Sequence, residues 1–472
     1  MVCNTFADDA KSAAADNGMP AVRRREISSA EFYKLRGDVT TIRPLVEGIF
    51  DALTNALTTP LTPQESNPEE KKGGDDLPAE ITVKAESYRV ALEDFNQMYL
   101  DNRWGDGLPL IPPTPDAVKW MLSGTSRNPY EVLGTINPKH GIATIEKIAI
   151  NAVMAGAKPE YLPVVIAAIE CLADETFDDL HFLASAGSFN LMVVVSGPIA
   201  EEIGMEAGIG FMGHGWRANN TIGRAIRLST LNIGHTWPGF NDMALTGRIS
   251  PHTFLTFSEN TELSPWQPYH ASRGFKAEDS CVTVSPIHGE SQISHFYGGM
   301  IGTWTAPGVL DRMVEDIVRT DRRSLFMWGT KGIGKYPGSG GGALNHMIVL
   351  FPELAAEFKK MGYDQKKLQD DLYQRTSIPY DELNHAEIKA IQTAMELGVI
   401  PADRKPVFQA ALKPGAKVPV VMSPENLHLF VAGGVPGCAF SFNYYRVPPY
   451  SQTALMTRLI TGATLTKAGS IE

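Results

Sequence analysis

The sequence predicts a layered α/β protein with a mixed sheet and a buried helical hairpin. Residues 191–195 are an uninterrupted, β-branched apolar run that ends in Ser-Gly-Pro, which is typical of a strand covered on both faces. Two nearly all-apolar segments, 142–157 and 159–173, meet at a Gly and Pro break and predict two packed helices. Further strand and helix candidates alternate at uneven intervals, which favours a mixed sheet over a simple doubly wound repeat. The other strands are expected at 254–257, 281–284, 324–328, 346–350 and 427–432, and the other helices at 309–320, 352–360, 365–375 and 381–397.

The chain of 472 residues exceeds what one hydrophobic core usually supports, so we expect a small segment and a large domain. The small segment, 1–62, is a partial α/β unit, with helices expected at 8–17 and 42–57, a turn at 18–20 and a short strand at 21–27. Residues 63–82 contain almost no apolar side chains and predict a solvated linker. The large α/β domain, 83–472, opens with a helix at 87–99 and shows no repeat of 20 to 50 residues.

Composition excludes some functions. The chain has 42 basic and 53 acidic residues, a net charge of −11, which argues against a nucleic-acid partner. The four cysteines are far apart and lack metal-ligand spacing, as expected of a reduced, cytoplasmic protein. The N-terminus has no basic-then-apolar signal pattern, and the longest apolar run, 161–173, is too short to span a membrane. We therefore expect an intracellular protein without a membrane partner.

The most unusual stretch is 204–239, where many glycines accompany three arginines, two histidines and two tryptophans. Asn219 and Asn220 are good N-cap residues, and the helix predicted from Thr221 would offer free amides to a carboxylate or phosphate. Arg217 or Arg224, whichever faces the helix start, would bind a carboxylate through two parallel hydrogen bonds. The alternative is a tight loop under a buried helix, with the arginines paired to surface acids.

Two histidines flank this helix. His214 and His235 are candidates for acid–base catalysis because histidine titrates near neutrality, although each can also serve a structural role. The glycines at 208–213 match G-x-G-x-x-G, but the expected strand ends near 195, so a dinucleotide site is disfavoured.

A second glycine cluster spans 329–342. It matches G-x-x-x-x-G-K, but Tyr336 replaces the Ser or Thr that would bind magnesium, which disfavours a nucleotide-binding P-loop. A lid that places Lys331 and Lys335 over an acidic ligand is one interpretation, and a flexible surface loop is the other.

Polar residues within apolar surroundings supply further candidates. Glu146, Lys147 and Asn151 interrupt the apolar helix expected at 142–157, and burial of a charge requires a partner or a cavity. We expect either a structural network or proton transfer by Glu146 and Lys147. Asp106, beside Trp104, suits either a turn or a substrate pocket.

His288, Glu290 and His295 lie close enough in sequence to supply metal ligands, although they match no strict motif. Cys438 is a possible nucleophile. The residues identify no cofactor.

Several stretches resemble a known family. The matching stretches are CNTF (3–6), DNGMP (16–20), DGLPLIPPT (106–114), EKIAINAVMAGAKPEYLPVV (146–165), RANNTIGRAIRL (217–228) and SPWQPYH (264–270). The N-terminal segment resembles the later part of a UGSC-type domain, named for a selenocysteine- or cysteine-Gly-Ser-Cys motif. The remainder resembles the large uncharacterised domain that accompanies it. That motif is absent from this sequence, so the resemblance implies that another chain supplies it, that the function is lost, or that the first half of the segment is missing.

Two functions follow as expectations. The first is an enzyme acting on a small anionic molecule, held by Arg217 or Arg224, with oxidoreductase or lyase chemistry implied only by the resemblance. The second is a non-catalytic partner subunit that completes or scaffolds a UGSC-type redox protein. Both are compatible with an oligomer.

Overall fold

The structure is a computed structural model in which two compact units can be distinguished. It describes residues 2–4, 7, 10–11, 14, 19, 21–28, 39–66, 80–177, 179–244, 246–248, 250–293, 304–329, 344–434, 439–445 and 455–464. The N-terminal unit comprises Met1–Asp94 and Thr236–Met243, and the large unit comprises Phe95–His235 and Ala244–Glu472. No helix in these described ranges is long and apolar enough to cross a bilayer.

The elements of the N-terminal unit are the parallel pair β1 (Val2–Cys3) and β2 (Glu26–Ile27), the helix α3 (Val39–Thr58) and the short helix α4 (Pro63–Ser66). One arginine joins the segment before β2 to the end of α3 and to α4. Arg23 donates to the carbonyls of Ala56, Thr59 and Pro60, which stabilises the C-terminal end of α3. It also pairs with Glu65, and the pKa of that carboxyl falls to about 2, chiefly through this hydrogen bond.

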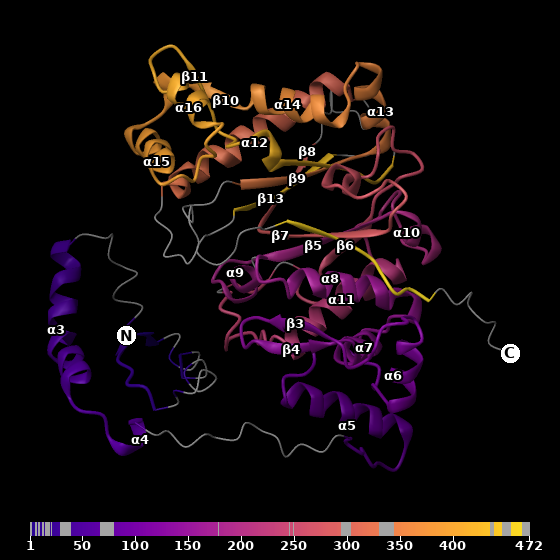
Figure 1. Ribbon diagram of the computed structural model, residues 1–472. Helices are drawn as coiled ribbons and strands as arrows, with labels where there is room; N and C mark the ends of the chain where they lie inside the picture. The colour runs from indigo at the N-terminus through magenta and orange to yellow at the C-terminus, as the bar shows by residue number, and fades with distance from the viewer. Residues whose placement is uncertain are drawn as a thin grey trace. The chain divides into compact units, whose positions relative to one another are not determined.

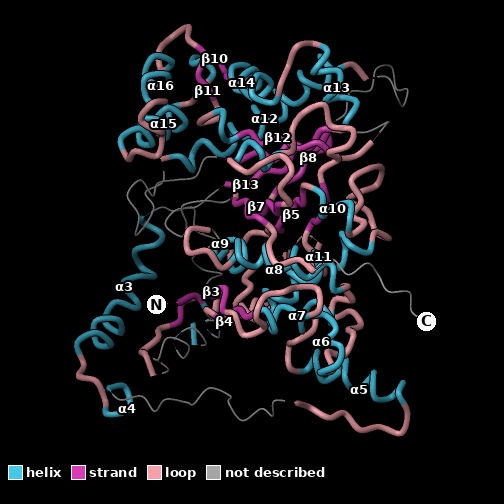
Figure 2. Tube along the Cα trace, turned by 45° about the vertical axis from the view of Figure 1, so that its right-hand side comes forward, coloured by secondary structure: helices cyan, strands magenta, loops and turns pink. Residues whose placement is uncertain are grey.

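The large unit contains two four-stranded sheets that lie one above the other, with helices on their outer sides (Figure 1). The first sheet has the order β14-β7-β5-β6, and the second has the order β12-β9-β13-β8. In Figure 2 the strands occupy the middle of this unit, between helices on either side. The strands are β5 (Asn190–Ser196), β6 (Leu255–Ser258), β7 (Cys281–Ile287), β8 (Gly289–Ile293), β9 (Leu344–Leu350), β12 (Leu427–Val431), β13 (Ala439–Tyr445) and β14 (Met456–Leu459). The α/β class with mixed sheets is therefore confirmed.

Helices cover the outer face of each sheet. The first sheet is covered by α8 (Leu162–Leu172), α9 (Asp179–Ala184) and α11 (Arg217–Asn232), and α7 (Ile145–Met154) packs beyond α8 and α11. The second is covered by α12 (Ala306–Trp328), α13 (Pro352–Lys360) and α14 (Gln365–Arg375), and α15 (His385–Glu396) packs against α12. The smaller elements are α5 (Tyr88–Asp101), α6 (Pro115–Leu122), β3 (Val132–Ile136), β4 (Gly141–Thr144), α10 (Pro198–Glu202), β10 (Ser377–Pro379), α16 (Lys405–Ala411) and β11 (Lys417–Pro419).

The helical hairpin is present, with a later start than expected. Residues 141–144 pair with β3 as the strand β4, and the side chain of Thr144 accepts a hydrogen bond from the Lys147 amide. This cap begins α7 at Ile145. Ten of the eleven residues of α8 are buried.

The strand expected at 324–328 is wrong, because these residues form the last turn and a half of α12. Asp321, Ser324, Leu325 and Trp328 are all buried, and their spacing places them on one face of a helix. A five-residue apolar run alone does not distinguish this face from a strand.

The two sheets repeat one topology. β5 is parallel to β6 and antiparallel to β7, and β9 is likewise parallel to β12 and antiparallel to β13. The strand that follows each of these three-stranded groups in the chain joins the other sheet: β8, which follows β7, pairs with β13, and β14, which follows β13, pairs with β7. The large unit therefore contains two structurally equivalent halves that exchange their last strands, although the sequence shows no repeat.

Candidate functional site

The anion site was expected at a helix start capped by Asn219 or Asn220, but the helix starts earlier than expected. α11 begins at Arg217 with Trp216 as the N-cap, and no side chain caps it. Asn219 is buried because its amide group binds the preceding loop: it donates to the carbonyls of Glu206 and Phe211 and accepts from the Glu206 amide. A polar side chain used in this way cannot cap its own helix.

The neighbouring predicted residues are also engaged with the backbone. Asn220 donates to the carbonyls of Gly213 and Trp216, and Thr221 donates to the carbonyl of Arg217. Arg217 is exposed, and its Nη2 donates to the carbonyl of Gly156 at 3.1 Å. His214 is exposed in the glycine loop.

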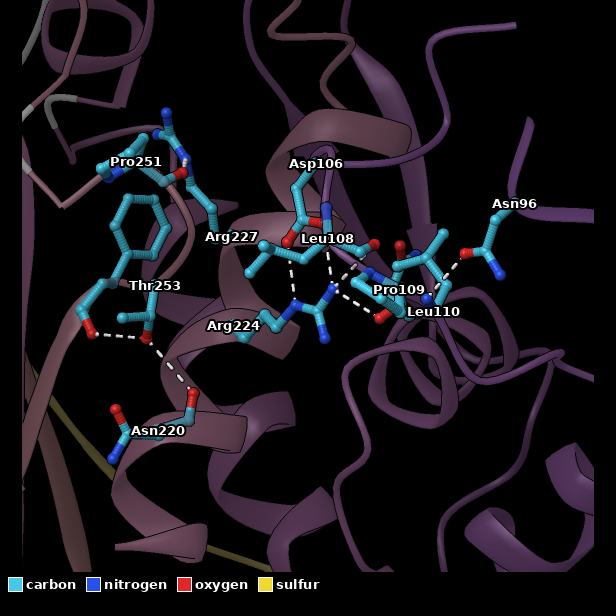
Figure 3. Close-up of polar contacts among 12 residues, drawn as sticks. Asn96, Asp106, Leu108, Pro109, Leu110, Asn220, Arg224, Arg227, Pro251 and Thr253 are labelled. Carbon is cyan, nitrogen blue, oxygen red and sulfur yellow. Dashed lines mark hydrogen bonds and ion pairs between the residues drawn. The ribbon is translucent and has the colours of Figure 1, made fainter. Parts of the chain in front are cut away.

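Arg224 and Asp106, both predicted to bind substrate, bind each other (Figure 3). The guanidinium Nε and Nη2 donate to the two carboxylate oxygens at 2.8 and 3.0 Å, and Nη2 also reaches the carbonyls of Leu108 and Pro109. Their side chains are only 16% and 6% exposed. This bidentate pair joins α11 to the loop that follows α5. Arg227, farther along α11, donates to the carbonyl of Pro251.

The residues predicted to transfer protons, Glu146, Lys147 and His235, do not line a shared polar cavity in the part of the chain that the structure describes. Lys147, expected to be buried, is exposed, because it lies in the first turn of α7 and its Nζ reaches back to the carbonyl of Ile142 at 3.0 Å. Asn151 is buried and accepts a 2.7 Å hydrogen bond from Asn232. Glu146 is half-buried. His235 adopts a positive φ of 59° just after α11.

The metal and lid candidates lie partly outside the described residues. His288 lies between β7 and β8 and Glu290 is on β8, whereas His295, Lys331, Lys335 and Cys438 fall outside the described ranges. Among the residues that the structure describes, no three His, Cys, Asp or Glu side chains form a group able to hold a metal ion.

A buried polar cluster that the sequence reasoning missed lies between the sheets. Ser196 ends β5 and Glu259 directly follows β6. Because these strands are parallel, their carboxyl ends meet at one edge, where α/β sheets commonly bind ligands. The chain then returns through a 3₁₀ turn, η3 (Tyr269–Arg273), which adds Tyr269 and His270. With His428 of β12, these residues form what we call the inter-sheet polar cluster: Ser196, Glu259, Tyr269, His270 and His428.

Ser196 and His270 form a hydrogen-bonded pair whose orientation is defined. Ser196 Oγ lies 2.7 Å from His270 Nδ1, and His270 Nε2 lies 2.9 Å from the carbonyl of Lys276. A carbonyl only accepts, so Nε2 carries the proton and Nδ1 accepts from the hydroxyl. Both side chains are buried.

Glu259 is the buried carboxyl of this cluster. Burial raises its pKa to about 7, even though hydrogen bonds from the amides of Tyr269 and Val431 act in the opposite direction. The Tyr269 amide donates to Glu259 Oε2 at 2.9 Å. A carboxyl with a pKa near neutrality can both release and take up a proton under physiological conditions.

Tyr269 connects the cluster to the second sheet. Its hydroxyl lies 3.0 Å from His428 Nδ1, and its ring packs against Phe430 at 4.3 Å. Burial lowers the pKa of His428 to about 3, so the imidazole is neutral. His428 Nε2 lies 3.4 Å from Asn345 Oδ1, which is consistent with a proton on Nε2 and acceptance of the tyrosine hydroxyl by Nδ1.

Tyr269 also belongs to the wall of a cavity of about 390 Å³. This volume lies at the small end of the range for small-molecule sites. The cavity is lined by Trp266, Gln267, Tyr269, Ala271, Ser272, Asp364, Gln365, Lys366, Gln369, Leu427 and Leu429. One tyrosine thus belongs both to an open cavity and to a buried acid–base cluster.

The other half of the large unit lacks these groups. The Glu259 amide donates to the carbonyl of Val195 at 3.0 Å, and the equivalent bond in the second half runs from the Ala432 amide to Leu350 at 2.9 Å. Alanine therefore occupies the position equivalent to Glu259, and Phe351, which follows β9, stands where Ser196 ends β5. Only one of the two equivalent strand edges carries titratable side chains at these positions.

A second buried group contains the residue types of a catalytic triad. His346 Nε2 lies 2.5 Å from Asp321 Oδ2, and His346 Nδ1 lies 3.4 Å from Ser441 Oγ. All three side chains are at most 1% exposed, and none lines the cavity. Burial raises the pKa of Asp321. The group joins α12 to the second sheet.

Sequence signals for the inter-sheet polar cluster were weak. Its members come from four distant segments, and the order of the strands decides that they meet. The stretch 264–270 was noted only for its resemblance, yet it supplies Trp266, Tyr269 and His270. Comparison of the chain with protein-family models, with curated proteins and with solved structures found no match.

Proposed function

We propose that the large unit is an enzyme that acts on a small anionic molecule by proton transfer, with the substrate in the Trp266–Tyr269 cavity. The observation that carries the proposal is the position of Tyr269, which is part of the cavity wall and whose amide binds the Glu259 carboxyl. Lys366 supplies a positive charge at the cavity. The anion site thereby moves from α11 to the region between η3 and α14.

In this proposal Glu259 takes a proton from the substrate and returns it to the substrate or product. Glu259 is buried and does not line the cavity, so this transfer requires the substrate, or a water molecule that carries the proton, to reach the carboxyl past Tyr269. Its pKa of about 7 suits both directions at neutral pH. Ser196 lies beside the carboxyl, and its hydroxyl hydrogen is donated to His270, which is anchored at the carbonyl of Lys276. Tyr269 stays protonated because burial raises its pKa, so it serves as a hydrogen-bond donor and positions the site.

This chemistry favours a lyase or isomerase over an oxidoreductase that uses Cys171 or Cys281, the two cysteines whose side chains the structure describes. Cys171 and Cys281 are both buried, and burial raises the pKa of each thiol, that of Cys281 to about 12. Thiols held in this state are weak nucleophiles. In an isomerisation a proton leaves a carbon beside the substrate's acidic group and a proton then returns to that carbon or a neighbouring one. In an elimination the same proton loss is accompanied by departure of a leaving group, with its bonding electrons, from the adjacent carbon.

The test is proton exchange. The protein is incubated in D₂O with small carboxylates and phosphate esters, and deuterium incorporation at carbon is followed by NMR. We expect incorporation into at least one of these compounds, a loss of at least 100-fold in Glu259→Gln, and no change in Glu262→Gln, an exposed carboxylate three residues away. Unchanged exchange in Glu259→Gln would refute the assignment.

The second candidate function is the partner subunit of a UGSC-type protein. One observation favours it: Phe50 and Leu57 of α3 are 60% and 85% exposed, seven residues apart on the same helix. Large exposed apolar side chains commonly mark interaction surfaces. Binding to a UGSC-type protein that carries Cys-Gly-Ser-Cys, and loss of that binding in Phe50→Glu but not in the exposed control Asp51→Asn, would support this function. Equal binding by wild type and Phe50→Glu would count against it.

A further inference from the structure

The walls of the cavity have two chemically distinct parts. Trp266, Tyr269, Ala271, Leu427 and Leu429 supply an apolar surface. The remaining side chains are mostly neutral hydrogen-bonding groups, together with one acid and one base: Gln267, Ser272, Asp364, Gln365, Lys366 and Gln369. A ligand that fits both parts combines an apolar body with a compact polar end.

The two charged residues constrain this polar end. Asp364 and Lys366 are two residues apart at the start of α14, and both line the cavity. A ligand with only a negative charge would be attracted by Lys366 and repelled by Asp364, and a ligand with only a positive charge would meet the reverse. A molecule with both charges close together is complementary to the pair.

Both charged groups retain capacity for a ligand. One oxygen of Asp364 accepts from the Lys367 amide at 2.7 Å, and a carboxylate offers about four acceptor sites. Lys366 pairs with Asp370, but the ammonium group has three hydrogens. These side chains are 63% and 41% exposed, so their pairing is weak and can rearrange.

Gln369 adds a fixed acceptor. Its Nε2 donates to the carbonyl of Leu427 at 2.7 Å, which leaves the amide oxygen available to an N–H of a ligand. An ammonium group beside a carboxylate would use both this oxygen and Asp364.

We propose that the ligand of this cavity is a zwitterion of the amino-acid class, with an apolar side chain against Trp266, Tyr269, Leu427 and Leu429, a carboxylate at Lys366 and an ammonium group at Asp364. The inference rests on the proposed function for the location of the substrate. It adds a second, positive charge to the anionic molecule expected there.

The experiment uses matched compounds that share one apolar body. Phenylalanine, 3-phenylpropanoate and phenethylamine are titrated into the whole protein by calorimetry, together with leucine, 4-methylpentanoate and 3-methylbutylamine. We expect each amino acid to bind at least about tenfold more tightly than its acid or amine, the factor that one charge-assisted hydrogen bond supplies.

Single substitutions test which cavity residue binds each charged group of the ligand. Asp364→Asn keeps the N-cap of α14 and should reduce the affinity of the amino acid to that of the acid. Lys366→Met should reduce it to that of the amine. Lys360→Met is the control, because it breaks a similar exposed ion pair, with Glu357 on α13, away from the cavity. Leu429→Trp, which fills the cavity, should abolish binding of all compounds.

The outcomes separate the two proposals. If the acids bind as tightly as the amino acids, the zwitterion inference is overturned and the proposed function stands. If the amines bind best, or if Leu429→Trp leaves every affinity unchanged while its thermal midpoint shows that it is folded, the proposed site is overturned as well.

Discussion

At the scale of single residues, Glu259 carries an energetic cost that is measurable without a substrate. Its pKa in the folded protein is about 7, above the ordinary value of 4.5. Between these pH values the folded state holds a proton that the unfolded state has released. The free energy of unfolding is therefore highest below about pH 4.5, falls as the pH rises towards 7, and changes no further above about pH 7. The total change due to Glu259 is on the order of 3 kcal/mol.

Substitution of Glu259 by Gln should remove this dependence. Gln keeps an oxygen for the Tyr269 amide and has no charge to bury. We expect a higher thermal midpoint than wild type at pH 8, little difference at pH 4.5, and a flatter profile between them in circular dichroism melts. Glu262→Gln should follow the wild-type profile. A Glu259→Gln variant with the full wild-type slope would show that another group is responsible.

The two arginines predicted to bind an anion, Arg224 and Arg217, are expected to differ in how much they stabilise the fold. Arg224 holds Asp106 in a largely buried bidentate pair, whereas Arg217 is exposed. Arg224→Met leaves the Asp106 carboxylate without its partner and should lower the free energy of unfolding by about 3 kcal/mol.

The control and the double variant are decisive. Arg217→Met should change stability by less than about 0.5 kcal/mol. Arg224→Met/Asp106→Asn should recover part of the loss, because the uncompensated charge is then absent. Urea unfolding measures all four proteins. Equal stability of Arg224→Met and wild type would mean that the pair does not stabilise the fold.

At the scale of elements, the turn after β5 positions Ser196. Gly197 adopts φ 96°, and an added Cβ would lie 2.1 Å from the carbonyl oxygen of Asp279. Gly204, at φ 68°, also lies in the left-handed region but has open space around it. Alanine at either position incurs strain of about 1–2 kcal/mol, and only at Gly197 does it also displace the chain before β7.

Gly197→Ala should therefore cost about 1–3 kcal/mol more than Gly204→Ala, because the clash with Asp279 adds to the strain. Thermal melts of both variants measure the difference. The turn beside Ser196 would also move, so Gly197→Ala should lose exchange activity while Gly204→Ala retains it. Equal stability of the two variants would contradict the close approach in the structure.

Elements with local signals were predicted well. α13 and α14 have the expected bounds because Pro352 begins one helix and the Asp364 side chain caps the other. The strand expected at 324–328 and the cap expected at 219–220 failed because distant contacts decide them. Asn219 belongs to the loop that begins near Glu206, and no propensity within α11 reveals this.

The candidate site was predicted less well than the fold, for a similar reason. Arginine, lysine and glycine clusters attract attention in a sequence, yet Arg224 and Asp106 neutralise each other in the structure. Glu259 and His270 stand in unremarkable local sequence, and they meet because β6 and η3 follow each other beside β5. The strand ends were expected, but their pairing order was not.

At the scale of the whole molecule, the exchanged strands β8 and β14 make each half of the large unit incomplete alone. β13 needs β8 from the first half, and β7 needs β14 from the second. The Arg458–Asp174 ion pair, 2.5 Å long, adds a further link between β14 and the first half. The buried cluster depends on both halves as well, because Tyr269 and His428 come from different ones.

A chain cut between Ile293 and Trp304 tests this dependence. We expect the fragments 1–293 and 304–472 to copurify when expressed together and to be insoluble when expressed separately, because each then exposes strand edges and half of the inter-sheet core. The fragment 304–455 lacks β14 and is the matched control. It keeps only one of the two exchanged pairings and should copurify in lower yield. If either fragment alone gives a stable, soluble monomer, or if removal of β14 leaves the yield unchanged, strand exchange does not hold the halves together and the shared cluster must be maintained by the inter-sheet core alone.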